Sequence, residues 1–340
     1  MKKSRFIFVL VVLILVACVP SGGLWGVPEV VGTATFTPPP PIVSTDTPAL
    51  TATPVTETVT ATPVPRAARV LIVSFDGLRP DAIAKAPMTN LLILMQASAY
   101  TLSAQTILPS STLPAHASML TGLCPSSHGV TWNDYIPENG YAKGTDIFDL
   151  AHAAGLRTVM VVGKEKLRQI TEPASTDVFA FVDGSEDDVA QRAIQEMTPG
   201  FGVMFVHFPQ GDLAGHSFGW LSQMQLRAYR EGDDAFGKLL AGLDFAGLRA
   251  STLIIVTADH GGHKTTHGSD APEDITIPWI INGPFVHAGQ LSGYVHTTDT
   301  AATAAFMLGL PRPAEWDGRP VMEAFGLPAE PRAMPVCVYK

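Results

Sequence analysis

Three separate stretches of this chain run from apolar, strand-forming residues into an aspartate. They are residues 70–75 before Asp76, residues 204–208 before Asp212, and residues 253–257 before Asp259. Continuous apolar runs of this length are typical of buried parallel strands. In open α/β sheets, ligands bind beyond the carboxyl ends of the strands. The sequence therefore predicts that distant parts of the chain bring three carboxylates to one edge of a sheet.

Expected strands and helices alternate along residues 67–335, a segment with the size of one large domain. Two further strands are expected at residues 157–162 and 277–281. Helices are expected at residues 87–98, 113–123, 145–154, 187–196, 221–243 and 299–308. Such alternation predicts an α/β domain whose mainly parallel sheet carries helices on both faces. We expect Thr145 to cap its helix.

The first residues have the pattern of an export signal. Basic residues precede an apolar run at residues 6–17, which is shorter than the ~20 residues that a membrane-spanning helix needs. The run ends in Leu-Val-Ala-Cys, closing at Cys18, and this resembles the bacterial lipobox. The resemblance implies a signal peptide at residues 1–17 and a lipid on Cys18, so that the protein is exported and anchored to the bacterial cell membrane on its extracytoplasmic side. An ordinary signal peptide, with Cys18 incidental, is the alternative.

Residues 18–66 are rich in threonine, proline and valine and carry almost no charge. Repeated proline removes backbone donors and fixes φ near about −65°, which disfavours both a helix and a packed sheet. We therefore expect a disordered tether between the membrane and the folded domain. At the other end of the chain, residues 336–340 are expected to form a short tail.

Charge and cysteine content exclude several kinds of partner and site. The net charge is −9, and the chain has no basic stripe with which to neutralise the phosphates of a nucleic-acid duplex. Cys124 and Cys337 remain besides Cys18. An exported protein can form disulfides, but these two cysteines lie far apart in sequence, and we expect them to stay unpaired. Neither belongs to a CxxC motif or a Cys-His cluster, so no thiolate zinc site is expected.

Histidines follow two of the three acids at short spacing. In Asp212-x-x-x-His216 a helix would place both side chains on one face, although the neighbouring glycines make a tight loop an equal alternative. Asp259 is followed directly by His260 and then by two glycines. Aspartate and histidine together suit zinc. Asp76 by itself would indicate little, because an aspartate at a strand end is often a turn former or a helix cap.

A hydroxyl group lies just before the expected helix at residues 113–123. Thr112 would lie at or near the start of this helix, with Pro114 in its first turn. Free backbone N–H groups at a helix start favour an anion such as phosphate, and a hydroxyl there can act as a nucleophile when a metal lowers its pKa. A simple capping threonine is the alternative.

Taken together, these residues resemble the alkaline phosphatase superfamily and, within it, the type I phosphodiesterase/nucleotide pyrophosphatase family. The resemblance extends from about Val70 to about Phe325. Its motifs are residues 74–80, 109–116 and 121–129, Asp212 with His216, residues 259–261, and His267-Gly268. The resemblance implies an α/β/α sandwich fold of the alkaline phosphatase type.

The same resemblance implies a site with two zinc ions, although other divalent metals suit the same ligands. The first zinc would be held by Asp76, Thr112, Asp259 and His260, and the second by Asp212, His216 and His267. Asn133 would hydrogen-bond the phosphoryl group.

His267, the third histidine of the two-zinc centre, has competitors. His267-Gly268 is preferred because it resembles the histidine loop of the family and precedes an apolar strand, whereas His263 is expected behind the ligands or at the surface. His116 and His128 fall within the motifs but are expected to make structural hydrogen bonds. His296 is a weaker candidate.

The resemblance implies a hydrolase of phosphoric esters that forms a phosphothreonine intermediate on Thr112. Its substrate would be a small phosphate ester, such as a nucleotide. We expect a phosphodiesterase or nucleotide pyrophosphatase, because Asn133 in place of an arginine favours diesters, which carry less charge than monoesters. A phosphomonoesterase or phosphonate hydrolase is the alternative, and a surface binding module without catalysis is a remote one.

A sulfatase is disfavoured by the residues around the nucleophile. Sulfatases of this superfamily need cysteine or serine in a C/S-x-P-x-R pattern. The matching segment here begins at Thr112 and has His116 in place of the arginine. Threonine cannot be converted to formylglycine.

Overall fold

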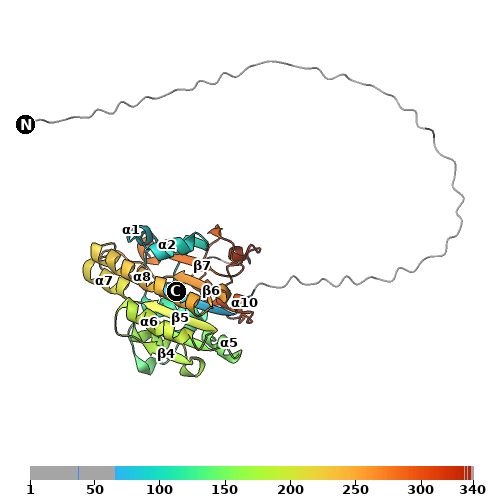
Figure 1. The fold of residues 1–340 in the computed structure, drawn as a ribbon, viewed down its shortest axis with the longest axis horizontal. Coiled ribbons are helices and arrows are strands. Elements are labelled where there is room, and N and C mark those ends of the chain that lie inside the picture. The colour runs from blue at the N-terminus through green and yellow to red at the C-terminus, as the bar shows by residue number, and fades with distance from the viewer. Residues whose placement is uncertain (1–36, 38–65, 333, 335, 338–340) are drawn as a thin grey trace, which may run out of the picture. The chain divides into compact units, whose positions relative to one another are not determined.

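The structure is a computed structural model that describes residues 37, 66–332, 334, 336 and 337 (Figure 1). The signal peptide and Cys18 lie outside these residues, as does the tether apart from residues 37 and 66, so export and lipidation stay predictions. Among the described residues, no helix has both the length and the apolar character needed to cross a membrane.

The described residues build one sheet of eight strands in the order β4-β3-β5-β1-β6-β7-β2-β8. In chain order the strands are β1 (Arg69–Phe75), β2 (Ala99–Gln105), β3 (Thr158–Val162), β4 (Val178–Phe181), β5 (Val203–Phe208), β6 (Thr252–Thr257), β7 (Thr276–Asn282) and β8 (Gly289–Gln290). The five strands from β4 to β6 are all parallel to one another. The carboxyl ends of β3, β5, β1 and β6 therefore meet at one edge of the sheet.

The remaining part of the sheet breaks the parallel pattern. Strand β7 runs antiparallel to both β6 and β2, while β2 and β8 are parallel. The expected mainly parallel sheet is confirmed. Strands β2, β4 and β8 were not predicted, because β2 mixes polar with apolar residues without a regular period and the other two are short and less buried.

Helices form two layers around the sheet (Figure 1). One layer comprises α1 (Pro80–Lys85), α2 (Thr89–Met95), α6 (Glu186–Met197), α7 (Gln210–Phe218) and α8 (Gln223–Phe245). The other comprises α3 (Thr112–Thr121), α5 (Ile147–Ala153) and α10 (Asp299–Leu308). Helices α6 and α5 both pack against β3 and β5, and α10 packs against β1 and β6. This is the expected α/β/α sandwich, and it explains why β1, β5 and β6 are apolar throughout: both faces of the sheet are covered.

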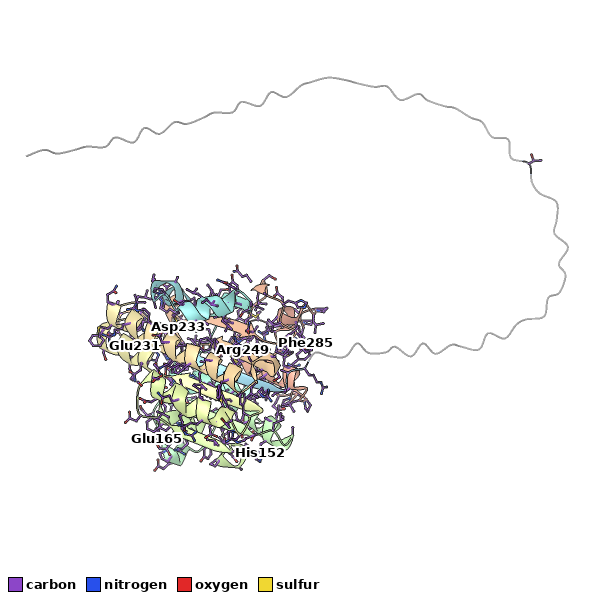
Figure 2. All side chains as sticks on the ribbon, in the orientation of Figure 1. His152, Glu165, Glu231, Asp233, Arg249 and Phe285 are labelled. Carbon is purple, nitrogen blue, oxygen red and sulfur yellow. A yellow bond between two sulfur atoms is a disulfide. The ribbon has the colours of Figure 1, made fainter. Side chains whose placement is uncertain are left out.

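Two carboxylates hold helix starts, one through local sequence and one across the fold. Asp146, rather than the expected Thr145, caps α5, because its side chain accepts from the N–H groups of Phe148 and Asp149 in a capping box. Asp233 of α8 (labelled in Figure 2) reaches α2 and accepts hydrogen bonds from the backbone of Asn90 and Leu91.

The expectation of unpaired cysteines is wrong. Cys124, which precedes the short helix α4 (Pro125–His128), forms a disulfide with Cys337, across a sequence separation of 213 residues. Both cysteines are buried, and they pack with Ile107 and Ala115. Sequence distance was a poor guide here, because the end of the chain returns to the motif region next to α3.

Candidate metal centre

The three predicted carboxylates lie at the carboxyl ends of three neighbouring strands. Asp76 follows β1 directly and Asp259 follows β6 by two residues, while Asp212 lies in the first turn of α7, just after β5. The parallel order β3-β5-β1-β6 makes these strand ends neighbours. The opening prediction is thereby confirmed: segments far apart in sequence bring three carboxylates to one edge of the sheet.

Each of the three buried carboxylates has one oxygen held by a donor and one without a partner. His207 Nε2 donates to Asp76 Oδ2 over 2.9 Å, the Gly77 N–H donates to Asp259 Oδ1 over 3.1 Å, and Lys164 donates to Asp212 Oδ2 over 2.6 Å. The opposite oxygens, Asp76 Oδ1, Asp259 Oδ2 and Asp212 Oδ1, are buried without a hydrogen bond in the described structure. A buried carboxylate oxygen without a partner is costly unless a cation completes it.

Three imidazoles are oriented in one common way. The Nδ1 atoms of His260, His267 and His216 bond the backbone carbonyls of Gly261, Ser110 and Thr265 over 2.7, 2.8 and 3.0 Å. Metal-binding histidines use a hydrogen bond of this kind to fix the ring and the tautomer. The Nε2 atom of each ring is therefore directed to the carboxylates.

The free atoms form two groups. In the first, His260 Nε2 lies 3.4 Å from Asp76 Oδ1, 3.2 Å from Asp259 Oδ2 and 3.4 Å from Thr112 Oγ1. These are the four residues that the sequence assigned to the first zinc. Asp76, Asp259 and His260 each offer an atom close enough to share one metal ion.

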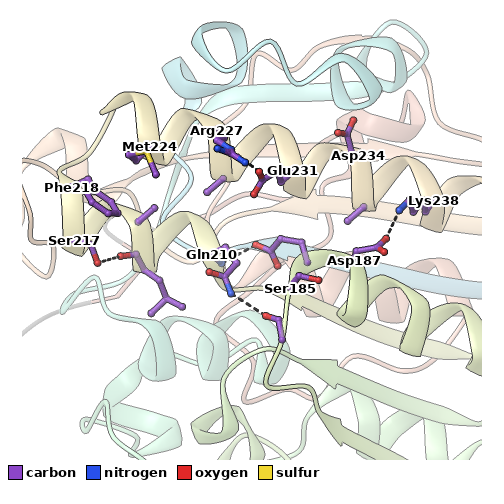
Figure 3. A pocket seen from close by; sticks show the side chains of 16 residues that line it. Ser185, Asp187, Gln210, Ser217, Phe218, Met224, Arg227, Glu231, Asp234 and Lys238 are labelled. Atoms are coloured by element: carbon purple, nitrogen blue, oxygen red, sulfur yellow. Dashed lines mark hydrogen bonds and ion pairs between the residues drawn. The ribbon is translucent and has the colours of Figure 1, made fainter.

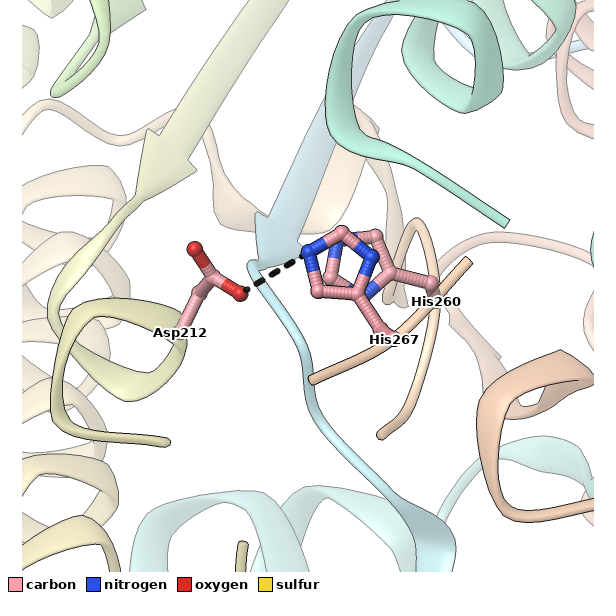
Figure 4. A group of neighbouring side chains, drawn as sticks. All are labelled: Asp212, His260 and His267. Atoms are coloured by element: carbon pink, nitrogen blue, oxygen red, sulfur yellow. Dashed lines mark ion pairs between the residues drawn. The ribbon is translucent and has the colours of Figure 1, made fainter. Parts of the chain in front are cut away.

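In the second group, Asp212 Oδ1 lies 3.4 Å from His216 Nε2 and 3.7 Å from His267 Nε2, an ion pair that is drawn in Figure 4. The two Nε2 atoms are 3.1 Å apart, close to the ~3.3 Å expected for two nitrogens on one tetrahedral zinc. Asp212, His267 and His260 also form a possible metal group, because the rings of His260 and His267 stack at 3.7 Å. The two groups are thus adjacent.

The donor set fits divalent metal ions. Burial opposes ionisation of Asp76, but Lys164 and His207 hold the pKa of this carboxyl well below its usual range. Burial together with the charge of Asp76 raises the pKa of Asp259 well above its usual range. Burial lowers the pKa of His267 to about 4, so its ring is neutral. Like-charged carboxylates beside neutral imidazoles are an arrangement that a cation stabilises.

Thr112 is the first residue of α3, and its side chain is 1% exposed. The residue that caps this helix is Ser111, and it makes no side-chain capping bond. Asn133 lies beside this helix start, where its Oδ1 accepts from the Leu113 N–H over 2.9 Å. The Asn133 amide nitrogen is therefore the end of the side chain that can donate to an anion at Thr112.

The sequence missed three residues of the site. Lys164 Nζ lies 2.6 Å from both Asp76 Oδ2 and Asp212 Oδ2, and Lys166 Nζ donates to Asn133 Oδ1 over 3.1 Å. His207 lies within β5 and supports Asp76. The lysines follow the end of β3, so the rule that strand ends carry ligands could have found them. His207 shows no such signal, because it sits inside an apolar run.

His263, His128 and His296 lie apart from the two groups, whereas His116 Nδ1 lies 3.5 Å from Asp259 Oδ2. His263 pairs with Asp274 over 2.7 Å, His128 bonds Ser118, and His296 bonds Thr298. His116 bridges Ser74 Oγ and the carbonyl of Thr112, a structural role that steadies the helix start.

A large cleft lies elsewhere on the domain (Figure 3). It measures about 920 Å³ and lies between α6, α7 and α8. The lining residues from α7 are Gln210, Leu213, Ala214, Ser217 and Phe218, and they do not include Asp212 or His216. The cleft and the candidate metal centre therefore use different faces of α7.

Comparison with known families identifies the domain. A family model described as type I phosphodiesterase / nucleotide pyrophosphatase matches residues 70–276, which include Thr112, Asn133 and all the candidate metal ligands. The chain belongs to this family.

Two curated relatives show the range of the similarity. An uncharacterized pyrophosphatase/phosphodiesterase of Schizosaccharomyces pombe is 27% identical over 63% of this chain and 47% of its own length. A bis(5'-adenosyl)-triphosphatase of Mus musculus is 24% identical over 57% of this chain and, again, 47% of its own length. The matched region of this chain thus corresponds to about half of each relative.

Solved structures share the fold. Murine ectonucleotide pyrophosphatase/phosphodiesterase 5 superposes with a TM-score of 0.63 at 16% identity, covering 76% of this chain and 99% of that one. An inactive variant of the murine protein was solved in complex with AMP. A sulfatase-like protein of Bacteroides thetaiotaomicron superposes with a TM-score of 0.67 at 14% identity, covering 79% and 76%. These likenesses establish an alkaline-phosphatase-like fold.

Proposed function

We propose that this chain is a zinc-dependent phosphoric ester hydrolase, and more specifically a phosphodiesterase or nucleotide pyrophosphatase that uses Thr112 as its nucleophile. One observation carries the proposal. The buried hydroxyl of Thr112 lies at a helix start, 3.4 Å from His260 Nε2, next to three carboxylates that each keep one oxygen free. Membership of the type I phosphodiesterase / nucleotide pyrophosphatase family supports the reaction class.

The proposed reaction is a displacement at phosphorus in two steps, and different residues of the chain act in it. The Thr112 oxygen attacks phosphorus, the bond to the leaving oxygen breaks, and a phosphothreonine forms. Water then attacks the same phosphorus and releases the threonine. Asn133 and the backbone at the start of α3 would hold the non-bridging oxygens. When bound, the metal ions would supply positive charge that lowers the pKa of the threonine hydroxyl and offsets the charge on the phosphoryl group.

The ligands of each metal follow from the two groups of free atoms. Asp76, Asp259 and His260 would hold the ion next to Thr112, and Asp212, His216 and His267 would hold the other. Zinc suits this set of carboxylate and imidazole ligands. The proposed nucleotide substrate rests on relatives whose names specify adenosine nucleotides. Export and a lipid anchor at Cys18 remain part of the proposal on the evidence of the sequence.

A binding module without catalysis is the competing proposal. The position of Thr112 beside the candidate metal ligands argues against it. A surface module has no need for a buried threonine hydroxyl beside free ligand atoms. The test compares Thr112→Ala with Thr89→Ala, because Thr89 is also the first residue of a helix, α2. Thr112→Ala should reduce hydrolysis of bis-p-nitrophenyl phosphate by at least roughly a thousandfold, and Thr89→Ala should leave it unchanged.

Two further measurements complete the test. Mass spectrometry of acid-quenched wild-type enzyme should find one phosphoryl group on the peptide that contains Thr112. Elemental analysis should find zinc bound to the wild type and to Thr112→Ala. An unchanged rate in Thr112→Ala would contradict the nucleophile, and a protein that binds no metal would contradict the centre.

A further inference from the structure

Two lysines follow the end of β3 and enter the region of the candidate nucleophile. Lys164 precedes the short 3-10 helix at Glu165–Gln169, and Lys166 lies within it. This short helix packs against α3, the helix that begins with Thr112. The Lys166 ammonium group lies at Asn133, whose side chain is bonded to the start of α3, and the Lys164 ammonium group lies between Asp76 and Asp212.

The surroundings of Asn133 are built from the same short helix. Gln169 accepts from the Ile136 N–H over 2.8 Å and donates to the carbonyls of Ile136 and Gly140 over 2.6 and 2.8 Å. Lys166 Nζ lies 3.1 Å from Asn133 Oδ1. The segment that carries Asn133 is therefore positioned by side chains of this helix, and Lys166 arrives next to the amide that would bind phosphate.

The two lysines differ in how their charges are balanced. Lys164 is held by the carboxylates of Asp76 and Asp212. Lys166 contacts a neutral amide instead, and no carboxylate of the described residues forms an ion pair with it. Burial and the neighbouring Lys164 lower the pKa of Lys166, so an anion that comes next to this ammonium group would stabilise it. These surroundings suit a lysine whose negatively charged partner is a bound ligand.

We infer that Lys166, supported by Lys164, binds the transferred phosphoryl group and gives the centre a further activity, the hydrolysis of phosphate monoesters. The transferred phosphoryl group of a monoester carries one more negative charge than that of a diester. Asn133 alone offers no positive charge for it, whereas Lys166 does. This inference rests on the proposed function, because it uses the same Thr112 nucleophile.

Hydrolysis of the monoester needs only water as a co-reactant. The Thr112 oxygen forms a bond to phosphorus, the ester P–O bond breaks, and the leaving alcohol takes up a proton. A water oxygen then replaces the threonine oxygen on phosphorus, and inorganic phosphate leaves. Cleavage of a diester produces a monoester, so the product of the first activity is a substrate of the second.

The experiment compares p-nitrophenyl phosphate with bis-p-nitrophenyl phosphate on the zinc-loaded protein. Lys166→Met should lower kcat/KM for the monoester by roughly tenfold to a hundredfold more than kcat/KM for the diester, since it removes one charge-assisted hydrogen bond to the more highly charged phosphoryl group. Lys166→Arg should keep most of the monoester rate. Lys238→Met is the matched control, because Lys238 is an exposed lysine of α8 that lines the separate cleft.

Binding of inorganic phosphate gives a second readout that does not depend on turnover. Calorimetry should find the affinity of zinc-loaded Lys166→Met weakened by roughly tenfold relative to the wild type and to Lys238→Met. Equal losses for both esters, or an unchanged phosphate affinity, would overturn the inference. So would a wild type that cleaves the diester but cleaves the monoester no faster than Thr112→Ala does. If the wild type cleaves neither ester, the proposed function fails, and the phosphate titration alone decides the role of Lys166.

Discussion

His207 Nε2 lies 2.9 Å from Asp76 Oδ2, and both side chains are fully buried. The two residues come from neighbouring strands, because His207 of β5 is in register with Ser74 of β1. The hydrogen bond holds one carboxylate oxygen and turns the other toward His260 Nε2. A residue inside the sheet therefore orients a candidate metal ligand at its edge.

Replacing His207 should weaken metal binding without removing a ligand. His207→Ala should reduce zinc affinity by roughly tenfold to a hundredfold, the usual effect of losing a hydrogen bond behind a metal ligand. His207→Gln, which can still donate to Asp76, should restore part of the affinity. Competition with a chromophoric chelator measures both. His152→Ala, at an exposed histidine of α5, should bind zinc like the wild type, and an equal loss in all three variants would contradict the positioning role.

Metal removal should expose the cost of the free carboxylate oxygens. Asp76 and Asp259 are both fully buried, and each has an unpartnered oxygen. Burial and the charge of Asp76 raise the pKa of Asp259, so keeping this carboxyl in the metal-free fold costs free energy that a neutral amide avoids. Without zinc, Asp259→Asn should therefore be more stable than the wild type by about 1–3 kcal/mol. With zinc the order should reverse, because the variant has lost a ligand. Thermal unfolding with and without chelator measures both effects, and an Asp259→Asn protein destabilised under both conditions would contradict the explanation.

Asn133 should contribute through its amide nitrogen rather than its oxygen. Asn133→Asp keeps the acceptor for the Leu113 N–H but replaces the amide nitrogen with a second oxygen and adds a negative charge. We expect kcat/KM for the diester to fall by roughly a hundredfold to a thousandfold, as for the loss of a donor to a phosphoryl oxygen. The melting temperature should not fall, because the new carboxylate lies next to Lys166. Steady-state kinetics and thermal unfolding together check this. A variant that kept its diesterase rate would show that Asn133 does not bind the phosphoryl group.

Glu186, in the cleft away from the metal centre, should make stability depend on pH. Its Oε1 accepts from the Gln210 N–H over 2.8 Å and its Oε2 has no partner among the described residues. Burial, assisted by the charge of Asp76, raises the pKa of Glu186 to about 8. The folded protein thus binds this proton more tightly than the unfolded chain does, and stability falls as pH rises from the ordinary glutamate value toward 8.

Glu186→Gln replaces the titrating carboxyl with an amide that stays neutral, and so tests its effect on stability. Between pH 6 and pH 8, the free energy of unfolding of the wild type should fall by about 2 kcal/mol relative to that of Glu186→Gln. Urea unfolding across this pH range measures the difference. Parallel pH profiles for the two proteins would show that Glu186 is not the group responsible.

The disulfide between Cys124 and Cys337 should stabilise the domain. A crosslink over a long segment restricts the unfolded chain, so the double variant Cys124→Ser/Cys337→Ser should lose about 2–4 kcal/mol. A reductant should lower the melting temperature of the wild type and leave that of the double variant unchanged. If the reductant affected both proteins equally, the change could not be attributed to this bond.

The sequence predicted what depends on short segments. Apolar strands that end in acids identified β1, β5 and β6, and the i, i+4 spacing of Asp212 and His216 agrees with the helix α7. The glycines beside this pair had left a loop equally open. Helical geometry prevailed because Gly211 and Gly215 lie where α7 packs closely, against Tyr229 and Trp220.

What depends on long-range contacts could not be predicted. Lys164 spans two carboxylates from separate strands, and only the strand order β3-β5-β1 places them within reach of one ammonium group. The antiparallel pairing of β7 leaves no mark on its own residues, because a buried strand is apolar in either direction. The cysteine pair failed as a prediction for the same reason: its geometry is a property of the closed fold.

The order in which the ligands occur along the chain has a consequence for biosynthesis. Asp76 is near the start of the domain and His267 comes after β6, so the ligands are spread over most of the length of the domain. No nascent fragment that ends before His267 contains the complete ligand set. Loading of both metals would therefore require synthesis past His267, and an exported chain would acquire them only in the compartment where it folds.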